Sequence, residues 1–330
     1  MRKTVCATLA VMMSVLFSPL SQAGQAWESY KARFFKPEGR IVDTGNGGVS
    51  HTEGQGFAML MAVANDDKAT FDKLWQWTNR ELKNKENGLF YWRYNPAESN
   101  PVADKNNAAD GDVLIAWALL KADARWHDKR YGAASDAITK ALVAHSVIRY
   151  AGYRVMLPGV QGFKLDGEAI LNPSYFVFPA WQAFAGRSHL PVWRDLIKDG
   201  KRLLGKMGSG KADLPADWVS LASDGKLEPA KGWPPRMSYD AIRIPLYLAW
   251  SDKQSPLLAP WKAWFGQFPR EQTPAWVNVM TNEYAPYMME GGLLAVRDLT
   301  MGQSSGEPEI TSKDDYYSAS LKMLAWISAQ

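Results

Sequence analysis

Apolar residues along this chain recur mainly at the three- and four-residue spacing of one face of an α-helix. The clearest run begins near Asp110 and has apolar side chains at Val113, Ala116, Trp117, Leu120 and Ala124. Ten other segments show the same spacing: 27–35, 56–63, 69–82, 131–148, 175–185, 192–207, 240–250, 257–268, 283–296 and 316–327. Loops rich in Gly, Pro, Asn and Asp separate most of them, so the pattern predicts eleven helices.

Strand signals are few by comparison. Residues 90–94 and 153–157 are the two segments that favour short strands. Helices with hardly any sheet predict an all-α domain of paired helices. A closed ring of helical hairpins and a two-domain bundle both satisfy this pattern, and periodicity alone does not separate them. Because no Pro/Thr/Ser-rich linker interrupts residues 24–330, we expect them to form a single domain.

The first 23 residues have the three parts of a secretory signal peptide. Arg2 and Lys3 precede the apolar stretch 5–20, and the small residues of 21–23 offer a cleavage site. No later segment has the ~20 apolar residues that a membrane anchor needs. The single cysteine, Cys6, lies inside this leader, so we expect an exported protein without disulfides, in a bacterial periplasm or secreted.

Composition narrows the class of ligand. Without Arg2 and Lys3 the chain has 36 basic and 34 acidic residues and no basic cluster, which argues against nucleic acid as a partner. The 15 Trp and 13 Tyr residues offer apolar rings on which the C–H faces of sugars can pack. We therefore examined the acidic residues for the paired carboxyl groups that glycosidic cleavage requires.

Glu53 lies in the segment 50–57, between a polar turn and an apolar run. Ser50 and Glu53 match a capping box, in which both side chains bind free amides at a helix start. Gly54 and Gly56 favour a functional role instead. Each glycine costs about 1 kcal/mol inside a helix, so we expect the backbone here to bend or to let a ligand approach.

Two further acidic segments lie downstream. Asp110 and Asp112 precede a helical run, where an N-cap or a favourable dipole interaction would explain them. A calcium loop is weakly supported, because the distal glutamate spacing is missing. Asp240 begins an apolar run and needs either a partner or a function, and Arg243 three residues later could form an ion pair with it.

Taken together, these segments resemble glycoside hydrolase family 8, and most closely the periplasmic cellulases of bacterial cellulose-synthesis operons. Residues 52–57 (TEGQGF) are similar to a family segment with Ser for Thr and Tyr for Phe. Residues 109–126 are similar to the family signature, with Ala109 where Ser or Thr is usual. Residues 172–175 (NPSY) and 238–243 (SYDAIR) also match, in the expected order.

The resemblance implies an (α/α)6 barrel of six inner and six outer helices with an open substrate cleft, and it implies neither a metal nor another cofactor. It implies an inverting mechanism in which Glu53 is the general acid and Asp240 the general base. Asp110 would hold the sugar beside the scissile bond, although some descriptions give this residue the role of nucleophile. The residues expected to bind substrate are Trp92, Tyr175, Tyr239, Arg243 and Asp112.

Position along the chain also divides the remaining aromatic residues. Near loops and motifs, we expect Tyr94, Trp181 and Trp233 to join Trp92, Tyr175 and Tyr239 in the cleft. Within helical runs, we expect core positions for Trp75, Trp77, Trp117, Trp126, Trp193 and Trp250. We interpret His51 as a hydrogen-bond donor behind Glu53, and residues 45–48 as a turn.

The leading functional hypothesis is endo-acting hydrolysis of β-1,4-glucan by a monomer, with the cellulose-synthesis machinery as a candidate partner. Alternatives are a family 8 xylanase or mixed-linkage glucanase, and a non-hydrolytic accessory that binds cellulose during secretion. An acid directly after Tyr239 disfavours a chitosanase. A polysaccharide lyase would favour Arg/Lys clusters, which the motif segments lack. Reducing-sugar release from carboxymethylcellulose separates a hydrolase from an accessory.

Export should remove residues 1–23, because they have the charged, apolar and small-residue parts that a signal peptidase recognises. N-terminal sequencing of the exported protein should begin at Gly24 or within a residue or two of it. An intact Met1 on active, soluble protein would contradict this prediction.

Overall fold

The computed structural model describes residues 24–303 and 306–330. The predicted signal peptide, residues 1–23, lies outside the described residues. The α-helices are α1 (Gln25–Phe34), α2 (Thr52–Ala64), α3 (Lys68–Glu81), α4 (Ala109–Trp126), α5 (Lys129–His145), α6 (Phe178–Ser188), α7 (Pro191–Leu204), α8 (Arg243–Ser251), α9 (Ala259–Phe265), α10 (Gly291–Thr300) and α11 (Tyr316–Ala329). The strands are β1 (Ser50–His51), β2 (Arg93–Tyr94), β3 (Val147–Tyr150), β4 (Tyr153–Met156), β5 (Glu168–Leu171), β6 (Val219–Ala222), β7 (Leu227–Pro229), β8 (Arg236–Met237) and β9 (Val277–Asn278).

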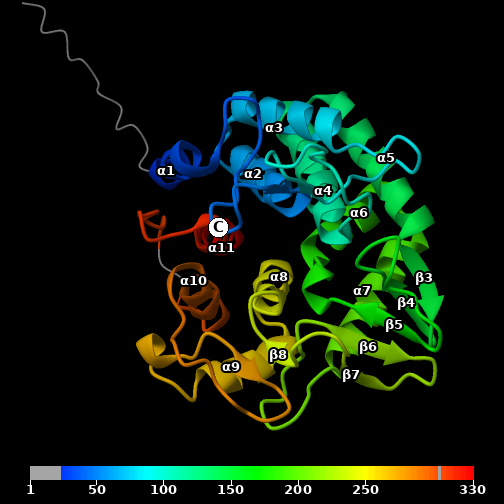
Figure 1. Cartoon of the computed structure of the whole chain (residues 1–330), viewed down its shortest axis with the longest axis vertical. Helices are drawn as coiled ribbons and strands as arrows, with labels where there is room; N and C mark the ends of the chain where they lie inside the picture. The colour runs from blue at the N-terminus through cyan, green and yellow to red at the C-terminus, as the bar shows by residue number, and fades with distance from the viewer. Residues whose placement is uncertain (1–23, 304–305) are drawn as a thin grey trace, which may run out of the picture.

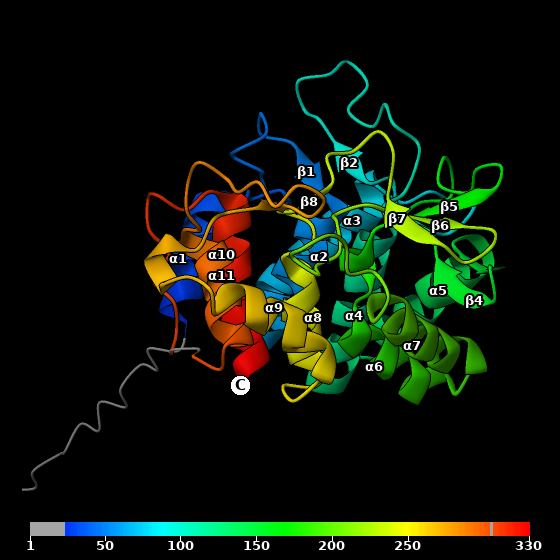
Figure 2. The same cartoon turned by 90° about the horizontal axis from the view of Figure 1, so that it is seen from below.

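Six helices form a closed inner ring. In the order α2, α4, α6, α8, α10 and α11, each packs on the next, and α11 packs back on α2. Helices α1, α3, α5, α7 and α9 lie outside this ring, and the first and last helices, α1 and α11, lie side by side (Figures 1 and 2). The predicted all-α barrel is confirmed.

The outer ring differs from the expectation of six helices. Between α10 and α11 the described residues, 301–303 and 306–315, form no α-helix. Gly302 has a positive φ of 72° and Pro308 follows nearby, and both residues disfavour a continuous helix. The sixth outer position is therefore covered by irregular chain, as far as the described residues show.

Burial along the helices explains which of them lie inside. In α2 every residue from Gly54 to Val63 is buried, and in α4 every residue from Ala109 to Leu119 is buried. By contrast, α7 buries mainly one stripe that includes Trp193, Leu196 and Leu203. A helix that is apolar on all sides must have neighbours on all sides, whereas an amphipathic helix can cover the exterior.

Helix boundaries depart from the sequence pattern at two places near the cleft. The helix predicted over 240–250 begins at Arg243, so Asp240 lies in the preceding turn. The helix predicted over 283–296 begins at Gly291, after a loop.

Strands β2 and β4 confirm the two predicted strand segments, whereas the antiparallel sheet β5–β6–β7 was not predicted. Figure 1 shows β3 to β7 gathered beside α5, α6 and α7.

The capping box at Ser50 is wrong. His51 is the N-cap of α2 and makes no side-chain cap hydrogen bond, and the Ser50 hydroxyl instead donates to the carbonyl oxygen of Ile41. This leaves the Glu53 carboxylate free to face away from its own helix end.

Glycines bring α2 and α4 unusually close together. A Cβ atom added at Gly56 would lie 2.5 Å from the Cβ atom of Leu114, and one added at Gly111 would lie 2.1 Å from the Thr52 hydroxyl. Similarly, a Cβ atom at Gly54 would lie 2.6 Å from the Tyr316 hydroxyl. The glycines around Gln55 therefore permit close packing of helices, and the expected bend or ligand approach is not their reason.

Replacing Gly56 by Ala should destabilise the protein by about 1–3 kcal/mol, because the added methyl group overpacks the contact with Leu114. It should also lower activity, since α2 carries Glu53 and α4 carries Asp110. Thermal unfolding and hydrolysis assays measure both effects. Gly186→Ala is the matched control: this exposed helical glycine has nothing within 4 Å of an added Cβ atom. A Gly56→Ala variant as stable and active as Gly186→Ala would contradict the packing argument.

Candidate active site

A pocket of about 420 Å³ opens at the end of the barrel where α2, α4 and α11 begin and where the turn before α8 lies. Strands β1, β2 and β8 lie at this end of the molecule (Figure 2). The acidic and aromatic residues that line it include Glu53, Asp110, Asp240, Trp92, Tyr175 and Tyr239. Most of the residues that the sequence motifs predicted for the site are thus brought together by the fold.

Arg243 lies at the centre of the acidic cluster. Its side chain is only 2% exposed, and Nη1 donates to Glu53 Oε2 and, at 3.3 Å, to Asp110 Oδ2. Nη2 donates to Asp240 Oδ1 at 2.8 Å and to Ser174 Oγ at 2.9 Å. One guanidinium therefore links the start of α2, the start of α4 and the turn before α8.

Glu53 is partly exposed to the pocket, with a side-chain exposure of 19%. The hydroxyl of Tyr316, the first residue of α11, donates to Glu53 Oε1 at 3.3 Å. Both carboxyl oxygens of Glu53 thus have a donor, one from α8 and one from α11. These two contacts hold the group at the mouth of the barrel.

Asp110 is almost completely buried beneath the pocket, with 3% of its side chain exposed. Burial raises its pKa from 3.8 to about 7, the nearby Asp112 charge adds to this rise, and the hydrogen bond from the Gly111 N–H opposes it. Asp110 therefore accepts a proton near neutral pH more readily than an ordinary aspartate.

Asp240 faces the pocket from the turn before α8, and 35% of its side chain is exposed. Burial of the carboxyl group raises its pKa from 3.8 to about 7, and the negative charges of Asp217 and Asp110 add to this rise. The ion pair with Arg243 favours the ionised form.

The charges of this cluster do not balance when all its acids are ionised. Glu53, Asp110 and Asp240 share the single guanidinium of Arg243. Carboxyl groups this close cannot all ionise freely, so the cluster holds a proton over a range of pH. A site that keeps one carboxyl group protonated beside an ionised one provides both an acid and a base.

Trp92 forms one wall of the pocket and is held in place by two neighbours. Its ring stacks on His51, with centroids 5.7 Å apart and an interplanar angle of 16°. Its indole N–H donates to Asp104 Oδ2 at 2.7 Å. Burial lowers the pKa of His51, so a neutral imidazole supports the Trp92 ring. His51 therefore packs against the Trp92 ring, and it also directly precedes helix α2, which carries Glu53.

Tyrosines also line the pocket. The Tyr175 ring lies 5.8 Å from the Arg243 guanidinium carbon, and Tyr239 is 45% exposed. The Tyr317 hydroxyl donates to the backbone carbonyl of Tyr239. Several aromatic side chains thus line the pocket together with the acidic cluster.

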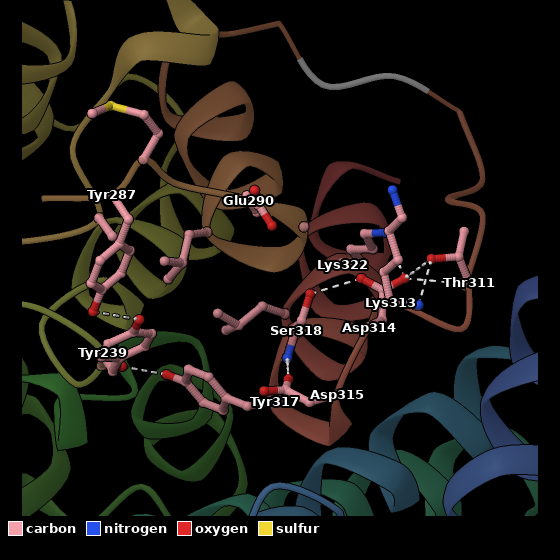
Figure 3. A pocket seen from close by; sticks show the side chains of 15 residues that line it. Tyr239, Tyr287, Glu290, Thr311, Lys313, Asp314, Asp315, Tyr317, Ser318 and Lys322 are labelled. Carbon is pink, nitrogen blue, oxygen red and sulfur yellow. Dashed lines mark hydrogen bonds and ion pairs between the residues drawn. The ribbon is translucent and has the colours of Figure 1, made fainter.

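The cleft continues past Tyr239 into a second pocket of about 460 Å³ (Figure 3). Tyr239 and Tyr317 line both pockets. Figure 3 shows Tyr239 beside Tyr287, with hydroxyl oxygens 3.3 Å apart, and Asp314 paired with Lys322 on the far side. Together the two pockets form an elongated surface rather than a closed chamber.

Five residues predicted for the cleft line neither pocket, and four of them are buried or packed among other protein groups. Arg243 is buried and holds carboxyl groups in place of sugar. Asp112 is fully buried and accepts hydrogen bonds from the Phe90 N–H and the Asn107 amide. Trp181 is 1% exposed in the core, and Tyr94 packs edge-on against Trp77. In each case tertiary contacts that spacing does not reveal decide the orientation.

The remaining aromatic predictions divide into two groups. Trp233 is 38% exposed and stacks on Trp218, but it lines neither pocket. Of the predicted core residues, Trp77, Trp117 and Trp193 are buried. The others, Trp75, Trp126 and Trp250, are partly buried and pack against the core.

Sequence reasoning gave no site role to several residues that line the pocket or act on its acids, among them Tyr316, Tyr317, Asp217 and Trp218. The triplet 315–317 (DYY) was the one available signal for the two tyrosines, since it combines a helix cap with paired hydroxyls. Asp217 and Trp218 lie in no motif.

Among residues 24–303 and 306–330, no group of three or more His, Cys, Asp or Glu side chains is placed to hold a metal ion. Over the same residues, no helix combines the length and the apolar character needed to cross a bilayer.

An all-helical barrel with three acids around one arginine in an aromatic cleft is the arrangement expected of a glycoside hydrolase. The chain belongs to glycosyl hydrolases family 8, whose sequence model matches residues 1–330. It is 62% identical over 303 residues to an endoglucanase of Cellulomonas uda, covering 92% of this chain and 84% of that protein.

Solved structures agree with this membership. A family 8 endoglucanase of Klebsiella pneumoniae superimposes with a TM-score of 0.91 at 66% identity, covering 92% of this chain and 98% of that one. An endo-β-1,4-glucanase of Acetobacter xylinum superimposes with a TM-score of 0.89 at 39% identity, covering 93% and 97%.

Activity should fall as the pH drops below about 7, because an ionised Asp240 becomes protonated on passing its raised pKa. The acidic limb of kcat/KM on a soluble β-1,4-gluco-oligosaccharide should therefore lie well above the ordinary value of 3.8. Since Asp110 and Asp240 interact, the apparent pKa belongs to the cluster. An acidic limb at pH 4 or below would contradict the raised pKa of Asp240.

Proposed function

We propose that the chain, an endo-β-1,4-glucanase, cleaves β-1,4-glucan by a single displacement that inverts the anomeric centre. The observation that carries this proposal is the placement of Glu53 and Asp240 on the two terminal nitrogens of Arg243, both facing one aromatic cleft. A single displacement needs one protonated and one ionised carboxyl group with a water molecule between sugar and base.

Glu53 is the general acid that protonates the leaving oxygen. It faces the pocket, whereas Asp110 lies beneath it, almost completely buried. The Tyr316 hydroxyl and Arg243 fix the carboxyl group in orientation, so that its proton points at one place along the bound chain.

Asp240 is the general base that removes a proton from the attacking water. Its exposure and its raised pKa, caused by burial and by the neighbouring acids, both suit this role. Asp110 pairs with Arg243 and lines the pocket, and it supports the sugar ring beside the scissile bond. No covalent sugar–enzyme bond is needed in this scheme.

The extended cleft supports internal cleavage of a polymer. Trp92 and Tyr239 line the same pocket as the acids, and the second pocket prolongs the surface past Tyr239. Glucose rings can stack on these aromatic faces on both sides of the bond to be cut. A chain can therefore lie across the site without presenting an end.

Location and partners extend the proposal. The leader-like composition of residues 1–23 supports export to the periplasm or the medium. The cellulose-synthesis machinery is a proposed partner on the strength of the sequence resemblance alone. We also propose that the enzyme acts as a monomer. Gel filtration and co-purification with cellulose synthase test these two points.

Trp92→Ala should weaken polymer cleavage mainly by raising KM, because a stacking platform binds the ground state and the transition state alike. We expect a smaller change in kcat. Trp75→Ala is the control, since this partly buried Trp packs against the core and lines neither pocket. If Trp92→Ala instead lowers the melting temperature strongly and leaves KM unchanged, Trp92 serves packing rather than substrate.

Glu53→Gln and Asp240→Asn should each remove nearly all activity while the fold is retained, because both changes keep shape and delete proton transfer. Glu271→Gln, a change at an exposed acid that lines neither pocket, should remain active. Proton NMR during early hydrolysis of a β-linked oligosaccharide should show the α-anomer first, and the two carboxyl groups should stand about 6.5–9.5 Å apart. Initial release of the β-anomer would contradict inversion and make Asp110 the candidate nucleophile.

A further inference from the structure

The turn that carries Asp240 is held by a carboxylate from a distant part of the chain. Asp217 Oδ1 accepts hydrogen bonds from the Ser238 N–H at 2.9 Å and the Ala241 N–H at 2.8 Å. Asp217 Oδ2 accepts a hydrogen bond from the Ser238 hydroxyl. These contacts enclose Tyr239 and Asp240 from both ends, although Asp217 itself lines neither described pocket.

The local chain does not supply these contacts by itself. Helix α8 begins at Arg243 without a side-chain cap, and its first amides form only short turns back to residues 240 and 241. The free N–H groups that precede such a helix need acceptors. Asp217 provides an acceptor from 21 and 24 residues away, so it acts as a cap built by tertiary structure.

Asp217 is in turn held by the strand region behind it. Its N–H donates to the Arg236 carbonyl oxygen at 2.7 Å, next to β8, and β6 begins two residues later. The adjacent residue, Trp218, contributes an N–H group near Asp240 and packs edge-on against Tyr175. The pair 217–218 therefore connects the strand region to the turn that carries the base.

We infer that Asp217 is a positioning residue for the general base, holding Asp240 toward the cleft through the backbone on either side of it. This inference rests on the proposed role of Asp240. Rotation of the turn would move Asp240 relative to Glu53, and small displacements of a catalytic group cost large factors in rate.

The charge of Asp217 adds a second effect. The groups that face Asp240 are Arg243 from α8, Asp110 from α4, Tyr317 from α11, Tyr175 from the turn before α6, and Asp217. After burial, the negative charge of Asp217 contributes most to the raised pKa of Asp240. A base with a higher pKa removes a proton from water more effectively.

The Asp217→Asn variant tests the charge of residue 217 separately from its role as a hydrogen-bond acceptor for the turn. The amide oxygen can still accept from Ser238 and Ala241, but the negative charge is gone. We expect a folded protein whose kcat falls and whose acidic limb moves about one unit to lower pH, because a like charge nearby is removed. Asp217→Ala, which also deletes the acceptor, should lose more kcat. Neither change should alter KM for a cello-oligosaccharide much, because Asp217 does not line the cleft.

Ser238→Ala is the second variant, for the case in which Asp217→Asn does not fold. It removes only the hydroxyl bond, which is worth about 1 kcal/mol, so kcat should fall about fivefold, whereas the acidic limb should stay near that of the wild type because the charge of Asp217 remains. The matched control is Asp224→Asn, an exposed acid between β6 and β7 that caps its own turn.

The outcomes distinguish this inference from the proposed function. If Asp240→Asn is inactive but folded Asp217→Asn and Ser238→Ala both keep the wild-type kcat and pH profile, Asp217 is structural only and the inference is wrong. If Asp240→Asn itself remains active, the proposed base is wrong. A loss of kcat in Asp217→Asn without movement of the acidic limb would overturn the charge effect and leave the positioning role.

Discussion

One buried guanidinium is the interaction on which the rest of the site depends. Arg243 begins α8 and reaches the first turns of α2 and α4, as well as the turn that carries Asp240. The positive ends of these helices already favour negative charge at the mouth of the barrel. Without Arg243, three acids would lie close together and partly shielded from water with no common positive partner, so the charge of Arg243 makes the cluster possible. Its two terminal nitrogens also set the positions of Glu53 and Asp240.

This cluster is possible only because the helices beneath it approach so closely. Gly56 and Gly111 remove side chains from the interface between α2 and α4, and Gly54 makes room for the Tyr316 hydroxyl. The same close contact that completes the core therefore brings the starts of α2, α4 and α11 to one point. The close packing of α2 against α4 determines both the core of the barrel and the positions of the acids in the cleft. Substitutions deep in α2 are therefore expected to affect the chemistry at its first turn.

Sequence reasoning located the acids but assigned some of their neighbours wrongly. The motifs around Glu53, Asp110 and Asp240 were found because short segments with unusual glycines and acids stand out from helical periodicity. Arg243 was expected to bind sugar and Asp112 likewise, yet both are buried among protein groups. A side chain next to a catalytic residue in sequence can face the core, and a rotation of about 100° per helical residue decides which way it faces. Sequence reasoning assigned no role to Asp217 and Tyr316, because they act only through contacts between segments that lie far apart in the chain.

The sequence by itself determined the number and approximate extent of the eleven helices, the three acids and the aromatic character of the cleft. Helical periodicity is a local property, because the spacing of apolar residues within a few turns shows which face of a helix is buried. The motifs that carry the acids are likewise short, contiguous segments. Tertiary structure alone decided how the ring closes, that irregular chain takes the sixth outer place among the described residues, and which donors surround each acid. It also decided the raised pKa values of Asp110 and Asp240, because the burial of both carboxyl groups and the approach of Asp217 and Asp110 to Asp240 arise only after segments far apart in the chain are packed together.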